Sequence, residues 1–67
     1  MKRWSVQTRC EVEDAKVDAF IEDVIAVCRQ HGMSLGHEDG HGAFIVEAPD
    51  ETNFTWLRSA FTGFPST

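Results

Sequence analysis

The chain has 67 residues, enough for a single domain spanning residues 1–67 and for a core that contributes only ~3–5 kcal/mol. A catalytic pocket needs walls and rigid support, so a chain this short favours a non-enzymatic protein with no catalytic residue and no cofactor. The formal net charge of −5 argues against direct binding to a nucleic-acid backbone. No apolar run approaches the ~20 residues of a membrane span, and no apolar segment follows the basic residues Lys2 and Arg3, so we expect a cytoplasmic protein without a membrane partner.

Residues 4–12 alternate between an apolar and a polar side, which is the pattern of a strand with one face on a core. The apolar side carries Trp4, Val6, Thr8, Cys10 and Val12. The other side carries Arg3, Ser5, Gln7, Arg9 and Glu11. The alternation predicts one continuous strand.

Two amphipathic helices are expected. The first spans about 14–31, with Asp14 as N-cap and Gly32 as the left-handed residue that ends it. Its apolar positions are Val17, Phe20, Ile21, Val24, Val27 and Cys28. The second begins at the cap Asp50 and ends before Gly63. Its apolar stripe is formed by Phe54, Leu57, Ala60 and Phe61, with Phe64 as a further candidate beyond the helix end.

Residues 33–48 have the pattern of a β-hairpin. Asp39-Gly40 is a strong signal for a two-residue turn, because a type I′ turn needs positive φ at both central residues. This turn pairs Leu35 with Phe44 and Met33 with Val46, and it places all four side chains on the core face.

The expected order is β-α-β-β-α, an α+β fold. A right-handed crossover makes the first two strands parallel, and the third then fits between them. We therefore predict a three-stranded sheet of order 1-3-2 with both helices on one face, a ferredoxin-like arrangement that lacks its last strand.

Such a sheet leaves one edge and one face uncovered, which favours a homo-oligomer. Ile45 lies in the middle of the uncovered face and Trp56 flanks the second helix, so both are candidate interface residues. Alternatively, this face forms a pocket for a small nucleotide between subunits, because arginine pairs with phosphates and polar side chains read bases. The candidate ligand-binding residues are Arg3, Arg9, His37, Glu38 and His41.

The first helix is acidic on its polar side. A solvated surface is the simplest interpretation, and the alternative is an interface that inhibits a basic nucleic-acid-binding protein. Asp18 and Glu22 are the candidate interface residues for this hypothesis.

The sequence His37-Glu38-Asp39-Gly40-His41 raises the possibility of a metal-dependent enzyme. A two-residue turn points His37 and His41 to opposite faces of the hairpin, so we predict no metal site. Cys10 and Cys28 occupy apolar positions and are expected to be buried. Two cysteines are too few for the disulfide framework of a small secreted domain.

Two segments of the chain carry a resemblance to a known group of proteins. They are Cys28-Arg29-Gln30-His31-Gly32-Met33-Ser34-Leu35-Gly36-His37-Glu38-Asp39-Gly40-His41-Gly42-Ala43-Phe44-Ile45-Val46 and Asn53-Phe54-Thr55-Trp56-Leu57. They are similar to small uncharacterised accessory proteins encoded by bacteriophages and prophages. The resemblance implies a host bacterial cytoplasm and a role in neutralising anti-phage defence. The partner would then be a nucleotide signal of that defence or a bacterial defence protein.

Overall fold

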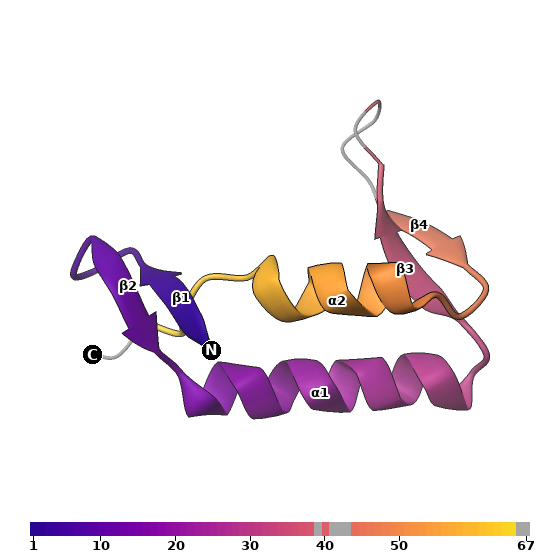
Figure 1. Cartoon of the computed structure of the whole chain (residues 1–67), viewed down its shortest axis with the longest axis horizontal. Helices are drawn as coiled ribbons and strands as arrows, with labels where there is room; N and C mark the ends of the chain where they lie inside the picture. The colour runs from indigo at the N-terminus through magenta and orange to yellow at the C-terminus, as the bar shows by residue number, and fades with distance from the viewer. Residues whose placement is uncertain (39, 41–43, 66–67) are drawn as a thin grey trace.

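The computed structural model describes residues 1–38, 40 and 44–65. Two helices lie side by side and antiparallel, and a β-hairpin stands at each end of the pair (Figure 1). In chain order the elements are β1 (Lys2–Ser5), β2 (Cys10–Glu13), α1 (Ala15–Gln30), β3 (Ser34–His37), β4 (Phe44–Glu47) and α2 (Glu51–Ser59).

The ends of α1 follow from local chemistry. Asp14 caps the helix by accepting a hydrogen bond from the backbone N–H of Val17. At the other end Gly32 has φ +68°, and the N–H groups of Gly32 and Met33 donate to the carbonyls of Arg29 and Cys28. This is a Schellman motif, and it confirms the predicted end of the helix. The N-cap Asp50, which accepts from Thr52 N–H, likewise confirms the start of α2.

The core lies between the two helices and is small. Its buried members are Val17, Ile21, Ile25, Cys28, Phe54 and Leu57. Val24, Leu35 and Trp56 pack against this cluster from its edges. No buried member comes from β1 or β2, so the N-terminal hairpin is attached to the rest of the protein by other means.

The prediction of one strand over residues 4–12 is wrong, because the chain reverses between Ser5 and Cys10. The backbone N–H of Arg9 donates to the carbonyl of Ser5, and Arg9 adopts φ 56°. The antiparallel register pairs Arg3 with Val12 and therefore places Trp4 and Val12 on opposite faces. A local reversal closes a much shorter loop than pairing with a strand beyond α1, so its entropic cost is lower.

The predicted three-stranded sheet of order 1-3-2 is also wrong. The described residues form two separate two-stranded antiparallel sheets, β1-β2 and β3-β4, so the arrangement is α+β but not ferredoxin-like. The physical reason is the N-terminal reversal. β1 pairs with its own neighbour β2 at the far end of the helices, and no long strand remains to pair beside β4.

The register of the second hairpin differs by two residues from the one predicted for a turn at Asp39-Gly40. Leu35 pairs with Val46, and His37 pairs with Phe44. Phe44 and Val46 are exposed rather than on a core face, because α2 packs against β3 and leaves β4 outside. Asp39, His41 and the rest of the turn lie outside the described residues.

Replacing Arg9 with glycine is expected to raise the midpoint of thermal unfolding. Arg9 lies at positive φ, which costs a non-glycine residue ~1–2 kcal/mol, and glycine removes this cost. The greater conformational freedom of glycine in the unfolded chain offsets only part of the stability gained. Glu11→Gly, within β2, is the matched control and should lower the midpoint. A lower midpoint for Arg9→Gly would indicate a continuous strand and contradict the hairpin.

Candidate functional site

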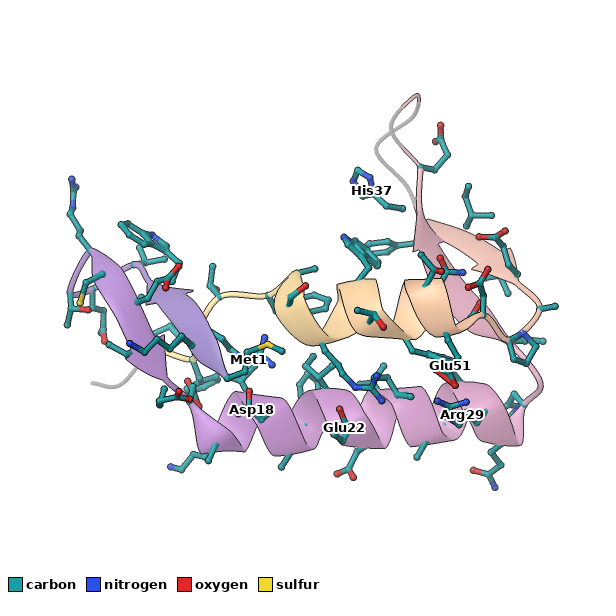
Figure 2. The ribbon with its side chains drawn as sticks, viewed as in Figure 1. Met1, Asp18, Glu22, Arg29, His37 and Glu51 are labelled. Carbon is teal, nitrogen blue, oxygen red and sulfur yellow. The ribbon has the colours of Figure 1, made fainter. Side chains whose placement is uncertain are left out.

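The N-terminal hairpin is attached through a buried arginine. Arg3 is only 3% exposed, and its Nε donates to Asp18 Oδ1 at 2.9 Å while its Nη2 lies 2.8 Å from the same oxygen. Arg3 Nη1 also donates to the carbonyl of Phe61 at 3.2 Å. Asp18 Oδ2 accepts from the α-amino group of Met1 at 2.7 Å, and Figure 2 shows Met1 next to Asp18. Polar contacts therefore join β1, α1 and the segment after α2.

A second acidic residue, the N-cap Asp14, completes this attachment. Its Oδ2 accepts from the backbone N–H of Phe64 at 2.8 Å, and the N–H of Gly63 donates to the carbonyl of Trp4 at 3.0 Å. Asp14 thus begins α1 and also holds the segment after α2 beside β1. We call these contacts of Arg3, Asp14 and Asp18 the polar latch.

The two carboxylates of the polar latch have lowered pKa values. The hydrogen bond from the Met1 α-amino group is the largest cause for Asp18, and Arg3 adds to it. The backbone N–H groups of Val17 and Phe64 lower the pKa of Asp14. A carboxylate with a depressed pKa stabilises the folded state above its ordinary pKa and loses that contribution as pH falls through its folded pKa. Acid therefore weakens the polar latch.

Two further ion pairs join α1 to α2. Glu22 Oε2 accepts from Arg58 Nε at 2.7 Å, and this hydrogen bond is the largest cause of the lowered pKa of Glu22. Arg29 Nη2 donates to Glu51 Oε1 at 2.8 Å, as Figure 2 shows at the C-terminal end of α1. The Arg29 guanidinium also lies 4.3 Å from the centre of the Phe54 ring.

These contacts change the interpretation of the acidic helix. Asp18 and Glu22, the candidate interface residues of the inhibitor hypothesis, are bound to Arg3 and Arg58 of the same chain. A basic partner would have to compete with these intramolecular arginines. The structure therefore gives this pair a role in holding the fold together.

The candidate ligand-binding residues are not brought together within one chain. Arg3 belongs to the polar latch, and Arg9 is exposed in the turn of the N-terminal hairpin. His37 and Glu38 belong to the hairpin at the opposite end of the helix pair (Figure 1). His41 lies outside the described residues. A nucleotide pocket built from this set would need a second chain.

An aromatic cluster lies where β3 and β4 meet α2. The His37 and Trp56 rings have centroids 5.5 Å apart and are tilted by 48°, and the Phe44 ring lies 5.8 Å from Trp56. Trp56 is half-buried, whereas the two residues from the hairpin are exposed. Figure 2 shows His37 above α2 near the base of the hairpin. We call His37, Phe44 and Trp56 the aromatic cluster.

A polar contact fixes the second hairpin on α2. Asn53 Nδ2 donates to the fully buried Ser34 Oγ at 2.9 Å and to Glu47 Oε1 at 3.2 Å, and Ser34 Oγ donates to the carbonyl of Ala48 at 2.7 Å. Gly36 lies against the same side chains, because a Cβ at this position would collide with Glu47 and come close to Asn53. The hairpin is therefore held at β3, which leaves β4 as its outer strand.

The outer strand β4 is exposed along its whole length. Phe44, Ile45 and Val46 have exposed fractions of 58%, 40% and 61%. Among the described residues, no strand other than β3 pairs with β4. Successive strand side chains point to opposite faces, so β4 presents apolar groups on both faces and an outer row of backbone groups.

Sequence reasoning missed a second apolar surface. Phe20 and Val27 are exposed on α1, beside the half-buried Val24, although the helical pattern assigned all three to the core. Phe61 and Phe64 are exposed too, and they line one hollow together with Phe20 at the N-terminal end of this row. We call Phe20, Val24, Val27, Phe61 and Phe64 the α1 stripe. The signal was the unusual width of the apolar arc of α1, which a sheet had been expected to cover.

Within residues 1–38, 40 and 44–65, no three His, Cys, Asp or Glu side chains are grouped closely enough to hold a metal ion. Cys28 is buried as expected, but Cys10 is exposed because β2 has no core against it. No helix in the described part of the chain is long and apolar enough to cross a membrane. Comparisons with protein-family models, with curated proteins and with solved structures found no match for this chain.

Removing the charge of Asp18 is expected to release the N-terminal hairpin while the helix pair stays folded. The two tryptophans report on these parts separately, since Trp4 lies in β1 and Trp56 in α2. In two-dimensional NMR spectra of Asp18→Asn, we expect the indole N–H signal of Trp4 to move toward its unfolded position and that of Trp56 to stay in place. Lowering the pH of the wild-type protein below the ordinary aspartate pKa of 3.8 should shift the Trp4 signal in the same direction.

The matched control is Asp23→Asn, which makes the same change on the same helix at an exposed residue. It should leave both indole signals unchanged. Equal movement of the two signals in Asp18→Asn would show that the hairpin and the helix pair unfold together, which would contradict a separate polar latch.

Proposed function

We propose that this chain is a non-enzymatic binding protein that captures an extended segment of a partner protein along β4. The observation that carries the proposal is the exposure of the whole of β4, which carries Phe44, Ile45 and Val46 before Glu47, at the edge of a two-stranded sheet. A two-stranded hairpin gains stability from a third strand, and the unpaired backbone groups of an edge give such a strand its hydrogen bonds.

The side chains around β4 supply selectivity for the captured segment. Ile45 lies on one face, and Phe44 and Val46 lie on the other, so an added strand would meet apolar neighbours on both sides. The aromatic cluster lies at one end of this edge and offers a large apolar contact beside the tilted rings of Trp56 and Phe44. A partner strand with alternating β-branched or aromatic residues fits this surface best.

The resemblance to phage-encoded accessory proteins suggests the setting. In this proposal the protein acts in a host bacterial cytoplasm and neutralises a bacterial defence protein by occupying one of its extended segments. The earlier candidate interface residues Ile45 and Trp56 have a direct role here, as the centre of the edge and as part of the aromatic cluster.

Capture of a nucleotide signal has less support. Of the two arginines expected to bind phosphate, Arg3 is committed to Asp18, and Arg9 stands at the opposite end of the helix pair from His37. Inhibition through the acidic helix has less support too, because Asp18 and Glu22 are paired within the chain. Neither alternative uses the exposed strand.

Selection from a library of displayed random peptides tests the proposal with a defined probe. We expect enriched peptides with alternating β-branched and aromatic residues, and we expect Ile45→Lys to reduce their affinity at least tenfold, since a lysine on an edge strand opposes strand addition. Val6→Lys is the matched control. Val6, like Ile45, is an exposed β-branched residue, but it lies in the N-terminal hairpin. It should bind the same peptides with unchanged affinity.

Two results would overturn strand capture. One is peptide binding that survives Ile45→Lys. The other is a saturable calorimetric signal with cyclic di- or oligonucleotides that is unaffected by Ile45→Lys, which would favour the nucleotide hypothesis instead.

A further inference from the structure

The α1 stripe is a surface that neither α2 nor the hairpins cover. Three members of the stripe, Phe20, Val24 and Val27, belong to α1. At 3.6 residues per turn they lie roughly 90° around the helix axis from the centre of the row of buried residues that faces α2. Phe20, Phe61 and Phe64 have exposed fractions of 63%, 39% and 74%. Single exposed apolar residues are common on protein surfaces, but a contiguous row of this kind indicates an interaction site.

The shape of the stripe can be complementary to a second copy of itself, because a projecting ring lies between two hollows. A hollow of about 350 Å³ lies on one side of Phe20, lined by Lys16, Val17, Phe20 and Phe64. A second hollow of about 500 Å³ lies on the other side of Phe20, and Val24, Val27 and Leu35 contribute to it. The ring of Phe20 thus borders a hollow at each of its flanks.

The backbone that carries the outermost ring of the stripe is held in place by the polar latch. The backbone N–H of Phe64 donates to Asp14, and the neighbouring Gly63 donates to the carbonyl of Trp4. The exposure of Phe64 is therefore a property of an anchored segment. Because the backbone is already anchored, only the side-chain rotamers of Phe64 lose conformational entropy when a partner covers the ring.

We propose that the α1 stripe binds a second copy of this chain, with the two α1 helices antiparallel about a two-fold axis near Phe20. An isologous contact of this kind places the same patch of both copies in register. With the axis at residue 20, Lys16 of each copy faces residue 24 of the other. Phe64, which lies beside Lys16, then projects toward the hollow near Val24 of the second copy.

Charge complementarity supports this occupant over an unrelated partner. Lys16 and Asp23 border the same side of the stripe, about 10 Å apart along the axis at 1.5 Å per residue. Neither makes an ion pair among the described residues. The two-fold arrangement brings each Lys16 to the Asp23 of the other copy, so that one patch supplies both members of two identical pairs.

The available area is sufficient for a small specific interface. At roughly 200 Å² for a whole aromatic side chain, the three phenylalanines leave on the order of 350 Å² exposed per chain. Two copies would bury on the order of 700 Å² through these rings, and contributions from Val24, Val27 and the stem of Lys16 raise the total toward the ~1,000 Å² of a specific interface. The contact also enlarges a core that comprises six buried apolar residues within the described part of the chain.

The experiment is sedimentation equilibrium of the full chain and its variants between about 5 and 200 µM. We expect a monomer–dimer equilibrium for the wild type, and we expect Phe20→Ser to raise the dissociation constant of the dimer at least tenfold. Lys16→Glu should weaken the dimer similarly, because it places Glu and Asp23 face to face. The double variant Lys16→Glu/Asp23→Lys should restore the dimer, a rescue that a merely structural role of either residue would not produce.

Lys2→Glu is the matched control. It makes the same charge change on β1, away from the stripe, and should leave the dimer unchanged. A wild type that stays monomeric at 200 µM would overturn the proposal. So would a dimer that survives Phe20→Ser and dissociates in Ile45→Lys, since this result would assign self-association to β4. Circular dichroism melts of each variant separate dissociation from unfolding.

Discussion

The narrow core between α1 and α2 is the constraint on which the rest of this structure depends. Among the residues that the structure describes, six buried apolar side chains, four from α1 and two from α2, hold the helices together, and neither hairpin contributes a buried member to that cluster. The N-terminal hairpin is attached through the polar contacts of Arg3 and Asp18, whereas the second hairpin combines the contact of Asn53 with Ser34 and the packing of Leu35 against the edge of the core. Apolar side chains that a larger sheet would have covered remain at the surface.

This constraint explains why the same chain exposes two different binding surfaces. β4 is exposed because α2 packs against β3, whereas the α1 stripe is exposed because neither sheet of the described residues covers that side of α1. Strand capture needs an edge with free backbone groups, and self-association needs a self-complementary apolar face. The two surfaces meet these needs on different elements, so a dimer formed through α1 leaves both β4 strands available to partners.

Local signals in the sequence predicted the helices well. Asp14 and Asp50 are caps and Gly32 is the left-handed residue, because capping depends on groups within a few positions. Strand pairing depends on distant groups, and the alternation over residues 4–12 is compatible with one strand or with two. Arg9 at the reversal gave no signal, since positive φ is expected of glycine or asparagine rather than arginine.

Residues of the candidate site could be predicted only where the local alternation of apolar and polar residues determines whether a side chain is exposed. Ile45 was expected on an uncovered surface and is exposed there, although in a different sheet. Arg3 looked like a free cation on a polar face, but it is buried against Asp18, which is 15 positions away in the sequence and was itself assigned to an interface. The α1 stripe could not be found from periodicity, because an apolar arc does not indicate how much of it the rest of the fold covers.

The separation of the two sheets is tested most directly by nuclear Overhauser contacts between backbone protons of the strands. We expect contacts between Trp4 and Glu11 and between Arg3 and Val12, and none between residues 2–13 and β4. Contacts that join residues 4–12 to Phe44–Glu47 in one sheet would contradict it, because the edge of β4 and the bare face of α1 would then be covered by the chain itself.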